Sequence, residues 1–153
     1  MKNSKPSPSL LGDVALISIH PPYVKKIMSG EKKLEFRRVW PTRPVEALVV
    51  YSTHPEQRLM GVVEIVGVLR ASKTALWRAA SEEGGGITRR ALFDYMDGKQ
   101  EGVALRLGAA TSLGSGVSPS TVFGPSFRAP QSFRYLTAVE KVNVRKLMEG
   151  TRK

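Results

Sequence analysis

The chain has 153 residues, of which 41% are hydrophobic, and a formal net charge of +11 at pH 7. This length suits one domain with a single core, and the hydrophobic content excludes a chain that is disordered throughout. The absence of cysteine excludes disulfides and thiolate metal sites, and no apolar run approaches the roughly 20 residues that a membrane span requires. We therefore expect a cytoplasmic protein whose positive charge attracts a polyanion, with nucleic acid as the leading partner and an anionic membrane surface as the weaker alternative.

The N-terminal part begins with a tail and continues as strand, helix and strand. Residues 1–12, rich in Ser, Pro and Lys, predict a flexible tail. The apolar run 13–19 predicts a central strand, and 21–30 predicts a short helix that begins at two prolines and ends at Gly30, a residue suited to the left-handed conformation. Residues 32–40 alternate between apolar and charged side chains, which is typical of a strand.

Two further strands and two helices are predicted in the middle of the chain. The strands cover 45–53 and the β-branched run 59–71, in which two glycines indicate bends or bulges. Ser or Thr caps predict helices over 73–83 and 89–97. The three glycines at 84–86 separate these helices, and we interpret them as a helix break.

The C-terminal part is predicted to contain one strand, a long loop and a final extended segment. The strand covers 102–108, and the Gly/Ser-rich run 109–126 predicts a loop of unusual length. Residues 130–142 carry the extended segment, and 143–153 form a basic tail. The domain between the two tails therefore covers 13–142.

The order of the predicted elements indicates the fold class. Strands outnumber helices, and the middle strands are joined by connections too short for a crossover helix, so these neighbours are expected to be antiparallel. The prediction is an α+β fold, with a small mixed β-sheet or barrel and helices on its outside.

Motifs for the common cofactors and metals are absent. The chain has no phosphate-binding GxxxxGK[ST] loop, because the glycines at 84–86 lack the following lysine. His20 and His54 are the only histidines, and neither lies near a second ligand at metal-binding spacing. We therefore expect neither a cofactor nor a metal.

The segment SGEKKLEFRR, residues 29–38, combines strand alternation with a high density of charge. Leu34 and Phe36 point to one side of the predicted strand, while Lys33, Glu35 and Arg37 share the other. One interpretation is a solvent-exposed face with weak cross-strand ion pairs. The alternative is a ligand-binding face, since buried charges must pair with each other or with a ligand.

The run ALISIHPPYVKKIMSGEKKLEFRR resembles the start of an ASCH domain, a relative of the PUA fold. In that family a strand and a short helix lead to a glycine, a lysine two residues later and an arginine near the end of the next strand, matching Gly30, Lys32 and Arg37. The runs VVYSTHPEQRLMGVVEIVGVL, GVALRL and APQSFRYL resemble later parts of the domain, so that the likeness covers about 14–140. It implies a PUA-like β-barrel with flanking helices.

The resemblance also implies a function. It implies a nucleic-acid-binding module that recognises RNA or a modified nucleotide in a cleft beside the turn from Gly30 to Lys32, with DNA as the alternative polymer and no membrane partner. Some members of the family resemble amidohydrolases that deacetylate acetylcytidine with a lysine, a threonine and a glutamate, and others have ribonuclease activity. Lys32 matches that lysine, but Glu35 stands where the threonine is expected, and Glu83 and Asp94 match the glutamate only loosely.

The candidate site residues follow from the charged strand and from the resemblance; Ser132 and Arg134 join them on the condition that the loop before them covers the cleft. For an enzyme, Lys32 and Glu35 are the catalytic candidates; Lys32 would then need a lowered pKa, whereas the charge of Glu35 would raise it. The residues expected to bind the ligand are Tyr23, Gly30, Lys32, Lys33, Glu35, Arg37, Arg38, Ser132 and Arg134. Tyr23, Trp40, Tyr51 and Trp77 are candidates for stacking on a base, although core packing is the stronger expectation for Tyr23, Tyr51 and Trp77.

Overall fold

The computed structural model of the chain describes residues 7–151, in which six strands form a single sheet. The strands are β1 (Val14–Ile19), β2 (Leu34–Arg37), β3 (Ala47–Ser52), β4 (Arg58–Ala71), β5 (Gly102–Val117) and β6 (Phe133–Tyr135). The helices are α1 (Pro21–Met28), α2 (Lys73–Glu83), α3 (Arg89–Tyr95), α4 (Ser120–Phe123) and α5 (Ala138–Thr151). The expected α+β class is confirmed.

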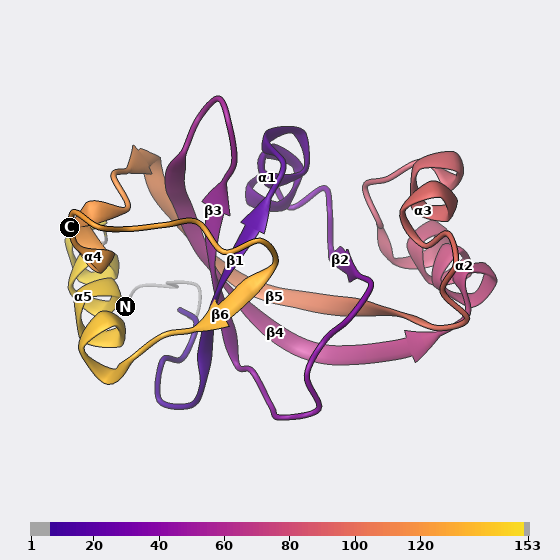
Figure 1. The fold of residues 1–153 in the computed structure, drawn as a ribbon, viewed down its shortest axis with the longest axis horizontal. Helices are drawn as coiled ribbons and strands as arrows, with labels where there is room; N and C mark the ends of the chain where they lie inside the picture. Colours follow the sequence, from indigo (N-terminus) through magenta and orange to yellow (C-terminus); the bar gives the residue numbers. More distant parts are fainter. Residues whose placement is uncertain (1–6, 152–153) are drawn as a thin grey trace, which may run out of the picture.

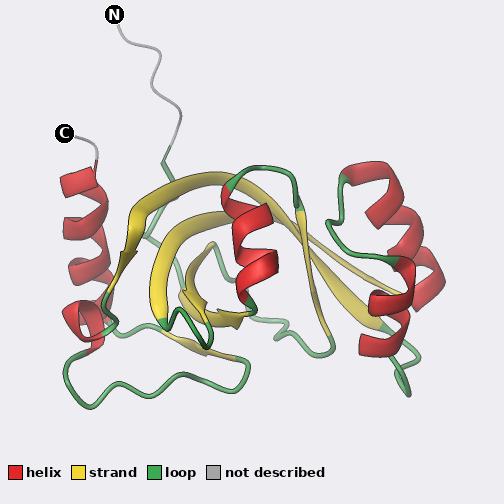
Figure 2. Ribbon diagram, turned by 90° about the horizontal axis from the view of Figure 1, so that it is seen from above, coloured by secondary structure: helices red, strands yellow, loops and turns green. Residues whose placement is uncertain are grey.

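The sheet has the strand order β2-β5-β4-β3-β1-β6 and curls into a half-barrel (Figure 2). β1 and β3 run parallel, and the other neighbouring strands are antiparallel, as expected for strands joined by short connections. Helices α2 and α3 lie at one end of the molecule, α4 and α5 lie at the other, and α1 lies against the sheet between them (Figure 1). No helix within residues 7–151 is both long and apolar enough to cross a membrane.

The helix ends have the caps that the sequence predicts. Ser72 and Thr88 each accept a hydrogen bond from the backbone N–H three residues later, at the starts of α2 and α3. Two prolines occupy the first turn of α1, where a missing N–H costs nothing. After α1 the chain turns at Gly30, which has a φ of +84°.

The prediction of a long loop at 109–126 is wrong. β5 continues to Val117, and the short helix α4 follows at Ser120–Phe123. Gly and Ser are turn formers by local preference, but here the backbone pairs with the long, β-branched strand β4, with Val63 opposite Ala110. The register of this pair shifts near Gly61 and Gly67 of β4, where the sequence indicated bulges.

Three groups of buried side chains make up the core. One lies beneath α5, one lies between α1 and the sheet, and one lies beneath α2 and α3. The domain boundary that we expected at residue 142 falls inside α5, whose Val144 and Met148 are buried in the first group. Leu10, within the predicted N-terminal tail, is also buried there, while residues 1–6 of that tail lie outside the described residues.

Residues 73–97, from the start of α2 to the turn after α3, form an arm at one end of the sheet, and we call them the α2–α3 arm (Figure 1). The arm has its own apolar core, in which Leu76 and Leu92 are fully buried. This core packs on Leu34 and Phe36 of β2. The apolar side of β2 therefore holds the arm, and its opposite side is free to carry the site.

Candidate functional site

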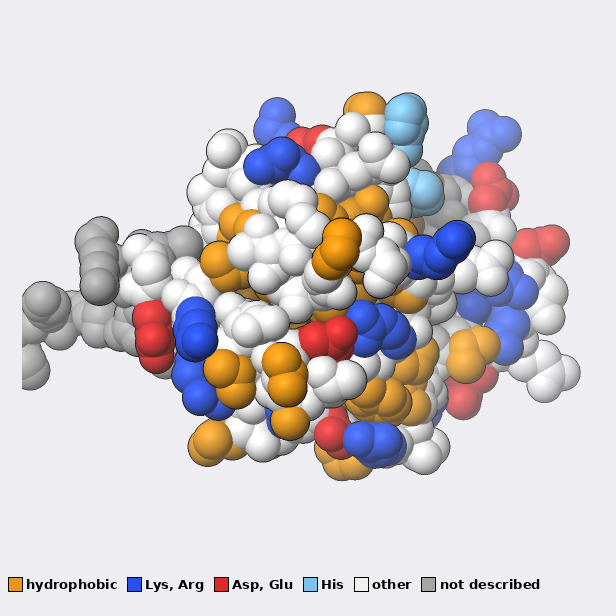
Figure 3. All heavy atoms as spheres, turned by 60° about the vertical axis from the view of Figure 1, so that its left-hand side comes forward, with side chains coloured by type: hydrophobic (Ala, Val, Ile, Leu, Met, Phe, Trp, Pro, Cys, Tyr) orange, Lys and Arg blue, Asp and Glu red, His pale blue; other side chains and the backbone are white. Residues whose placement is uncertain are grey.

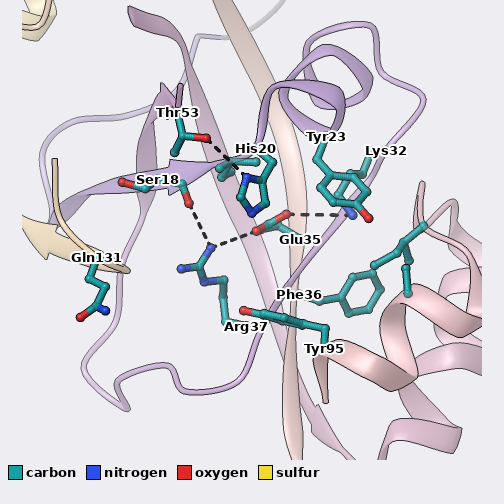
Figure 4. Close-up of a pocket in the computed structure, with 13 residues that line it drawn as sticks. Ser18, His20, Tyr23, Lys32, Glu35, Phe36, Arg37, Thr53, Tyr95 and Gln131 are labelled. Carbon is teal, nitrogen blue, oxygen red and sulfur yellow. Dashed lines mark hydrogen bonds and ion pairs between the residues drawn. The ribbon is translucent and has the colours of Figure 1, made fainter. Parts of the chain in front are cut away.

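A pocket of about 390 Å³ lies between α1, β2 and the α2–α3 arm (Figure 4). Segments far apart in the sequence supply its walls: the end of β1, the start of α1, β2, the turn after β3, the arm and the segment before β6. The ends of β1 and β3 meet here because these strands are parallel and Ile19 is paired with Ser52. Such an edge, outside the carboxyl ends of parallel strands, is a common place for ligand sites.

The floor of the pocket is formed by three charged side chains from β2 and the turn before it. Lys32, Glu35 and Arg37 are only 3%, 6% and 8% exposed, so the solvent-exposed strand face considered above is wrong for these residues. Strand alternation is the local cause: Leu34 and Phe36 point into the core of the arm, so Glu35 and Arg37 point to the opposite side.

Glu35 lies between the two cations. One carboxylate oxygen, Oε2, is 3.2 Å from Nη1 of Arg37, and Oε1 is 4.0 Å from Nζ of Lys32. Arg37 also donates from Nη2 to the hydroxyl of Ser132 at 2.8 Å and from Nη1 to the carbonyl of Ser18 at 3.4 Å. With both cations protonated and Glu35 ionised, the row carries one positive charge that no carboxylate of the row balances, which favours an anionic ligand.

Lys32 has an unusual environment. Its ammonium donates a 2.6 Å hydrogen bond to the carbonyl of Gly85, and it lies 5.1 Å and 4.9 Å from the ring centroids of Tyr23 and Phe36. Burial lowers the pKa of Lys32 from 10.5 to about 8; Glu35 raises this pKa, and the neighbouring charge of Lys26 lowers it slightly further. The expected effect of Glu35 is present, but burial outweighs it.

The pocket has two different walls. His20, Thr53 and Gln131 stand on the polar side, where Nδ1 of His20 is 3.4 Å from the hydroxyl of Thr53 (Figure 4). Tyr23 and Tyr95 stand on the other side with apolar residues of the arm, and burial raises the pKa of Tyr95. A ligand with a flat apolar part and a polar, anionic part suits these walls and the charged floor.

The structure brings together some of the predicted site residues and separates others. Tyr23, Lys32, Glu35 and Arg37 line the pocket, and Ser132 touches it through its bond to Arg37.

The other predicted residues lie elsewhere. Gly30 and Lys33 border a second depression, on the side of the α1–β2 turn that faces β5. Arg38 donates from Nη1 to the carbonyls of Tyr95 and Asp97 at 2.7 Å and 2.9 Å. Arg134 forms an ion pair of 3.0 Å with Glu140 of α5. None of these four residues lines the pocket, and their contact with a ligand stays a prediction.

The remaining candidates have structural partners. Trp40 and Tyr51 are buried in the core, and Trp77 packs against the core of the arm, in line with the core packing expected for Tyr51 and Trp77. Glu83 pairs with Arg106 outside the pocket, and Asp94 is an exposed residue of α3.

Several pocket residues are absent from the sequence-based predictions. They are Ser18, His20, Thr53, Tyr95 and Gln131. One signal was available for His20 and Thr53: polar residues directly after two apolar strands indicate a shared sheet edge if those strands are parallel. Within residues 7–151, no three side chains of His, Cys, Asp or Glu are grouped so as to hold a metal ion.

The basic residues outside the pocket form no single continuous patch on the face seen in Figure 3. Lys and Arg side chains stand there in separate places, interleaved with hydrophobic and acidic ones. In the pocket, by contrast, buried positive charge lies on a concave surface.

Comparisons with known proteins agree with this architecture. The family model of the ASCH domain matches residues 17–107, which include the end of β1, the whole of α1 and the charged row. The chain belongs to the ASCH domain family, as the resemblance in sequence predicted. A curated relative from Zymomonas mobilis, named ASCH domain-containing ribonuclease, is 29% identical over 94 residues. The aligned part spans 61% of this chain and 63% of the relative.

Solved structures show the same fold. The crystal structure of ASCH from Zymomonas mobilis matches with a TM-score of 0.79 and 24% identity, covering 88% of this chain and 94% of that chain. A Tyr-to-Phe variant of the Zymomonas protein also matches with a TM-score of 0.79, at 23% identity and over 88% and 97% of the two chains. The half-barrel with flanking helices is thus the PUA-like ASCH fold.

Proposed function

We propose that this protein binds single-stranded RNA and takes one nucleotide into the pocket. The buried row Lys32–Glu35–Arg37, with its unbalanced positive charge facing the pocket, is the observation that carries the proposal. Because these cations are almost inaccessible at the surface, a phosphate must enter the pocket to reach them, which suits an unpaired nucleotide better than one held in a duplex. Unpaired bases of RNA can be splayed out in this way and stacked on aromatic side chains.

The walls support the same ligand. Tyr23 and Tyr95 offer apolar ring surface to a base, while Arg37 and Lys32 offer donors to a phosphate. Thr53 and Gln131 can exchange hydrogen bonds with a ribose. A modified nucleotide of the same size remains within this proposal, and DNA is the alternative polymer.

A binding titration tests this proposal. Fluorescence anisotropy would compare the binding of a short single-stranded RNA and of duplex DNA at two salt concentrations. The logarithm of the RNA binding constant should fall with the logarithm of the salt concentration, with a slope of about −0.7 for each phosphate contacted. The double variant Lys32→Ala/Arg37→Ala should lose most of the RNA affinity. The control Arg78→Ala/Arg90→Ala removes two exposed charges of the arm and should lose much less. Equal losses in both variants would place the binding site outside the pocket.

Cleavage of the bound RNA is a second candidate function. It is favoured by Lys32, whose pKa of about 8 keeps it protonated at neutral pH yet makes it a better acid than an ordinary lysine. The name of the Zymomonas relative, a ribonuclease, points the same way.

The residues suggest a reaction that uses the ribose itself. Glu35 takes the proton of the 2′-hydroxyl, the 2′-oxygen bonds to phosphorus, and the bond from phosphorus to the 5′-oxygen breaks. Lys32 gives its proton to that leaving oxygen, and Arg37 stabilises the charge that develops on the phosphorane. The products are a 2′,3′-cyclic phosphate and a free 5′-hydroxyl.

Labelled RNA distinguishes cleavage from binding. With chelator present, wild type should produce cyclic-phosphate ends, and Lys32→Ala and Glu35→Gln should each lower the rate by about 100-fold or more, as expected for loss of a general acid or base. An RNA with one 2′-deoxynucleotide at the cut position should bind and stay intact. If wild type leaves all RNA intact while binding it, the cleavage function is wrong and binding remains.

Deacetylation of acetylcytidine remains the weaker alternative. Lys32 is placed at the pocket floor as such a reaction requires, but Glu35 occupies the position where that subgroup has threonine, and neither Glu83 nor Asp94 lines the pocket. Incubation with acetylcytidine, followed by chromatography, would decide this alternative.

A further inference from the structure

The glycine run at 84–86 does more than interrupt a helix. Its three backbone carbonyls each accept a hydrogen bond from the segment that carries the site: Gly84 from the backbone N–H of Lys33 at 2.7 Å, Gly85 from Nζ of Lys32 at 2.6 Å, and Gly86 from Nζ of Lys26 at 3.4 Å. The loop that joins the two helices of the arm is thus bound along its length to the α1–β2 turn.

The close approach requires glycine. A Cβ at Gly86 would lie 2.7 Å from Cβ of Lys32 and 2.8 Å from its Cγ, distances that force one of the two chains to move. A Cβ at Gly85 would lie 2.5 Å from Cβ of Ala80. Gly86 also has a φ of +62°, in the left-handed region.

The Gly85 carbonyl is the nearest polar partner of the buried ammonium. The charged and aromatic groups around Lys32 come from α1 and β2: Lys26 and Tyr23 from the helix, and Glu35 from the strand at 4.0 Å. The arm contributes a neutral carbonyl at 2.6 Å, which fixes the direction of the ammonium without adding a charge.

We propose that the Gly84–Gly86 loop is a positioning element of the site, which fixes the ammonium of Lys32 on the pocket floor and makes the site depend on the placement of the α2–α3 arm. The loop acts through Lys32 and is not itself a catalytic group. The importance of the contact for RNA rests on the proposed function, but the contact can be tested without RNA.

The test compares two glycine substitutions. Gly86→Ala introduces a methyl group against Lys32, whereas Gly98→Ala introduces one at a similar positive φ, +79°, where no atom lies within 4 Å of the added carbon. Both variants carry the same kind of backbone strain, so only the contact with Lys32 distinguishes them. The side-chain resonances of Lys32, assigned with a Lys32→Arg variant, would be followed by NMR against pH.

We expect the Lys32 stem to be displaced in Gly86→Ala, so that the ammonium loses its burial and its pKa rises from about 8 toward 10.5. In Gly98→Ala the pKa should stay near its wild-type value. An unchanged pKa in a folded Gly86→Ala, or an equal change in Gly98→Ala, would overturn the proposal.

A measurement on the wild type tests the proposal even if the Gly86→Ala variant does not fold. The carbonyl carbon resonance of Gly85 should shift with pH at the midpoint of the Lys32 titration, because the proton of that ammonium bonds to this carbonyl. A Gly85 resonance independent of pH in that range would overturn the proposal as well.

RNA assays on the same variants keep the two proposals separate. If wild type neither binds nor cleaves RNA while Gly86→Ala changes the Lys32 titration, the proposed function fails and the positioning role stands. If wild type acts on RNA and Gly86→Ala acts equally well with an unchanged titration, the positioning role fails and the function stands.

Discussion

Arg37 and Ser132, which are 95 positions apart in the sequence, are joined by a 2.8 Å hydrogen bond from Nη2 to the serine hydroxyl. The bond connects β2 to the segment directly before β6, at the opposite edge of the sheet. It holds the guanidinium toward the pocket while Glu35 holds its other terminal nitrogen. The arginine is thus oriented before any ligand arrives, which lowers the cost of ordering it on binding.

Replacing Ser132 should therefore weaken binding more than stability. In Ser132→Ala, Arg37 keeps its ion pair with Glu35 but loses the hydroxyl that directs it, and we expect RNA affinity to fall by up to about tenfold, the value of one good hydrogen bond. Anisotropy titration measures the affinity, and urea unfolding measures the stability. Ser126→Ala, at an exposed serine of the preceding segment, is the control; equal affinities of the two variants would contradict this role.

The lowered pKa of Lys32 predicts that stability rises with pH. Between pH 8 and 10.5 the folded protein has released the Lys32 proton while the unfolded chain still binds it, so raising the pH favours the folded state. The full effect is about 3 kcal/mol, and it should be visible up to pH 10, above which the raised pKa values of Tyr51 and Tyr95 act in the opposite direction.

Urea unfolding from pH 7.5 to pH 10 measures this effect. The difference in unfolding free energy between wild type and Lys32→Met isolates it, because the variant lacks the titrating group. If this difference in unfolding free energy stays constant or falls as the pH rises from 7.5 to 10, Lys32 titrates normally in the folded protein.

Removing the charge of Glu35 should lower the pKa of Lys32 further. Glu35 is the main group that raises this pKa, so in Glu35→Gln a larger fraction of Lys32 is neutral at pH 7. Arg37 also loses its buried anionic partner, and we expect the variant to be less stable by about 3 kcal/mol. NMR titration checks the pKa and denaturant unfolding checks the stability; a Lys32 pKa above 8 in this variant would refute the assignment of Glu35.

Arg38 should stabilise the arm rather than the sheet. Its guanidinium donates to two carbonyls at the end of α3, a favourable place for a cation, and Tyr95 of the pocket wall is one of the residues held. In Arg38→Ala we expect a loss of about 1–2 kcal/mol and faster amide exchange over 92–97. The control is Arg90→Ala, whose ion pair with Asp94 joins side chains that are 94% and 76% exposed; an equal effect in both variants would contradict the role of Arg38.

Strand β2 shows how much of the site could be predicted from the sequence. Period-two alternation is a local property, and it correctly separated Leu34 and Phe36 from Glu35 and Arg37. Whether the charged side is buried depends on the arm and on the segment before β6, which no local pattern places. Ser132 belongs to the predicted site only on the condition that the loop before it covers the cleft, and the sequence does not determine that placement.

The residues that prediction missed are those whose position depends on distant pairing. Tyr95 enters the pocket from the end of a helix whose placement depends on Arg38 and on the core of the arm. The second half of β5 reads as a loop because glycine and serine favour turns locally, whereas its pairing with β4 is set by the whole sheet. Local propensity determined the helix caps at Ser72 and Thr88 and could not determine these contacts.

The strand order has a consequence for synthesis. β2 lies at an edge of the sheet, and its strand partner β5 is made much later, with Leu34 opposite Arg106. Since a chain emerges from its N-terminus, the lysine, glutamate and arginine of the floor stay unassembled until β5 has left the ribosome, and Ser132 follows later still. A nascent chain therefore has no finished pocket, and the RNA binding proposed above requires the completed chain.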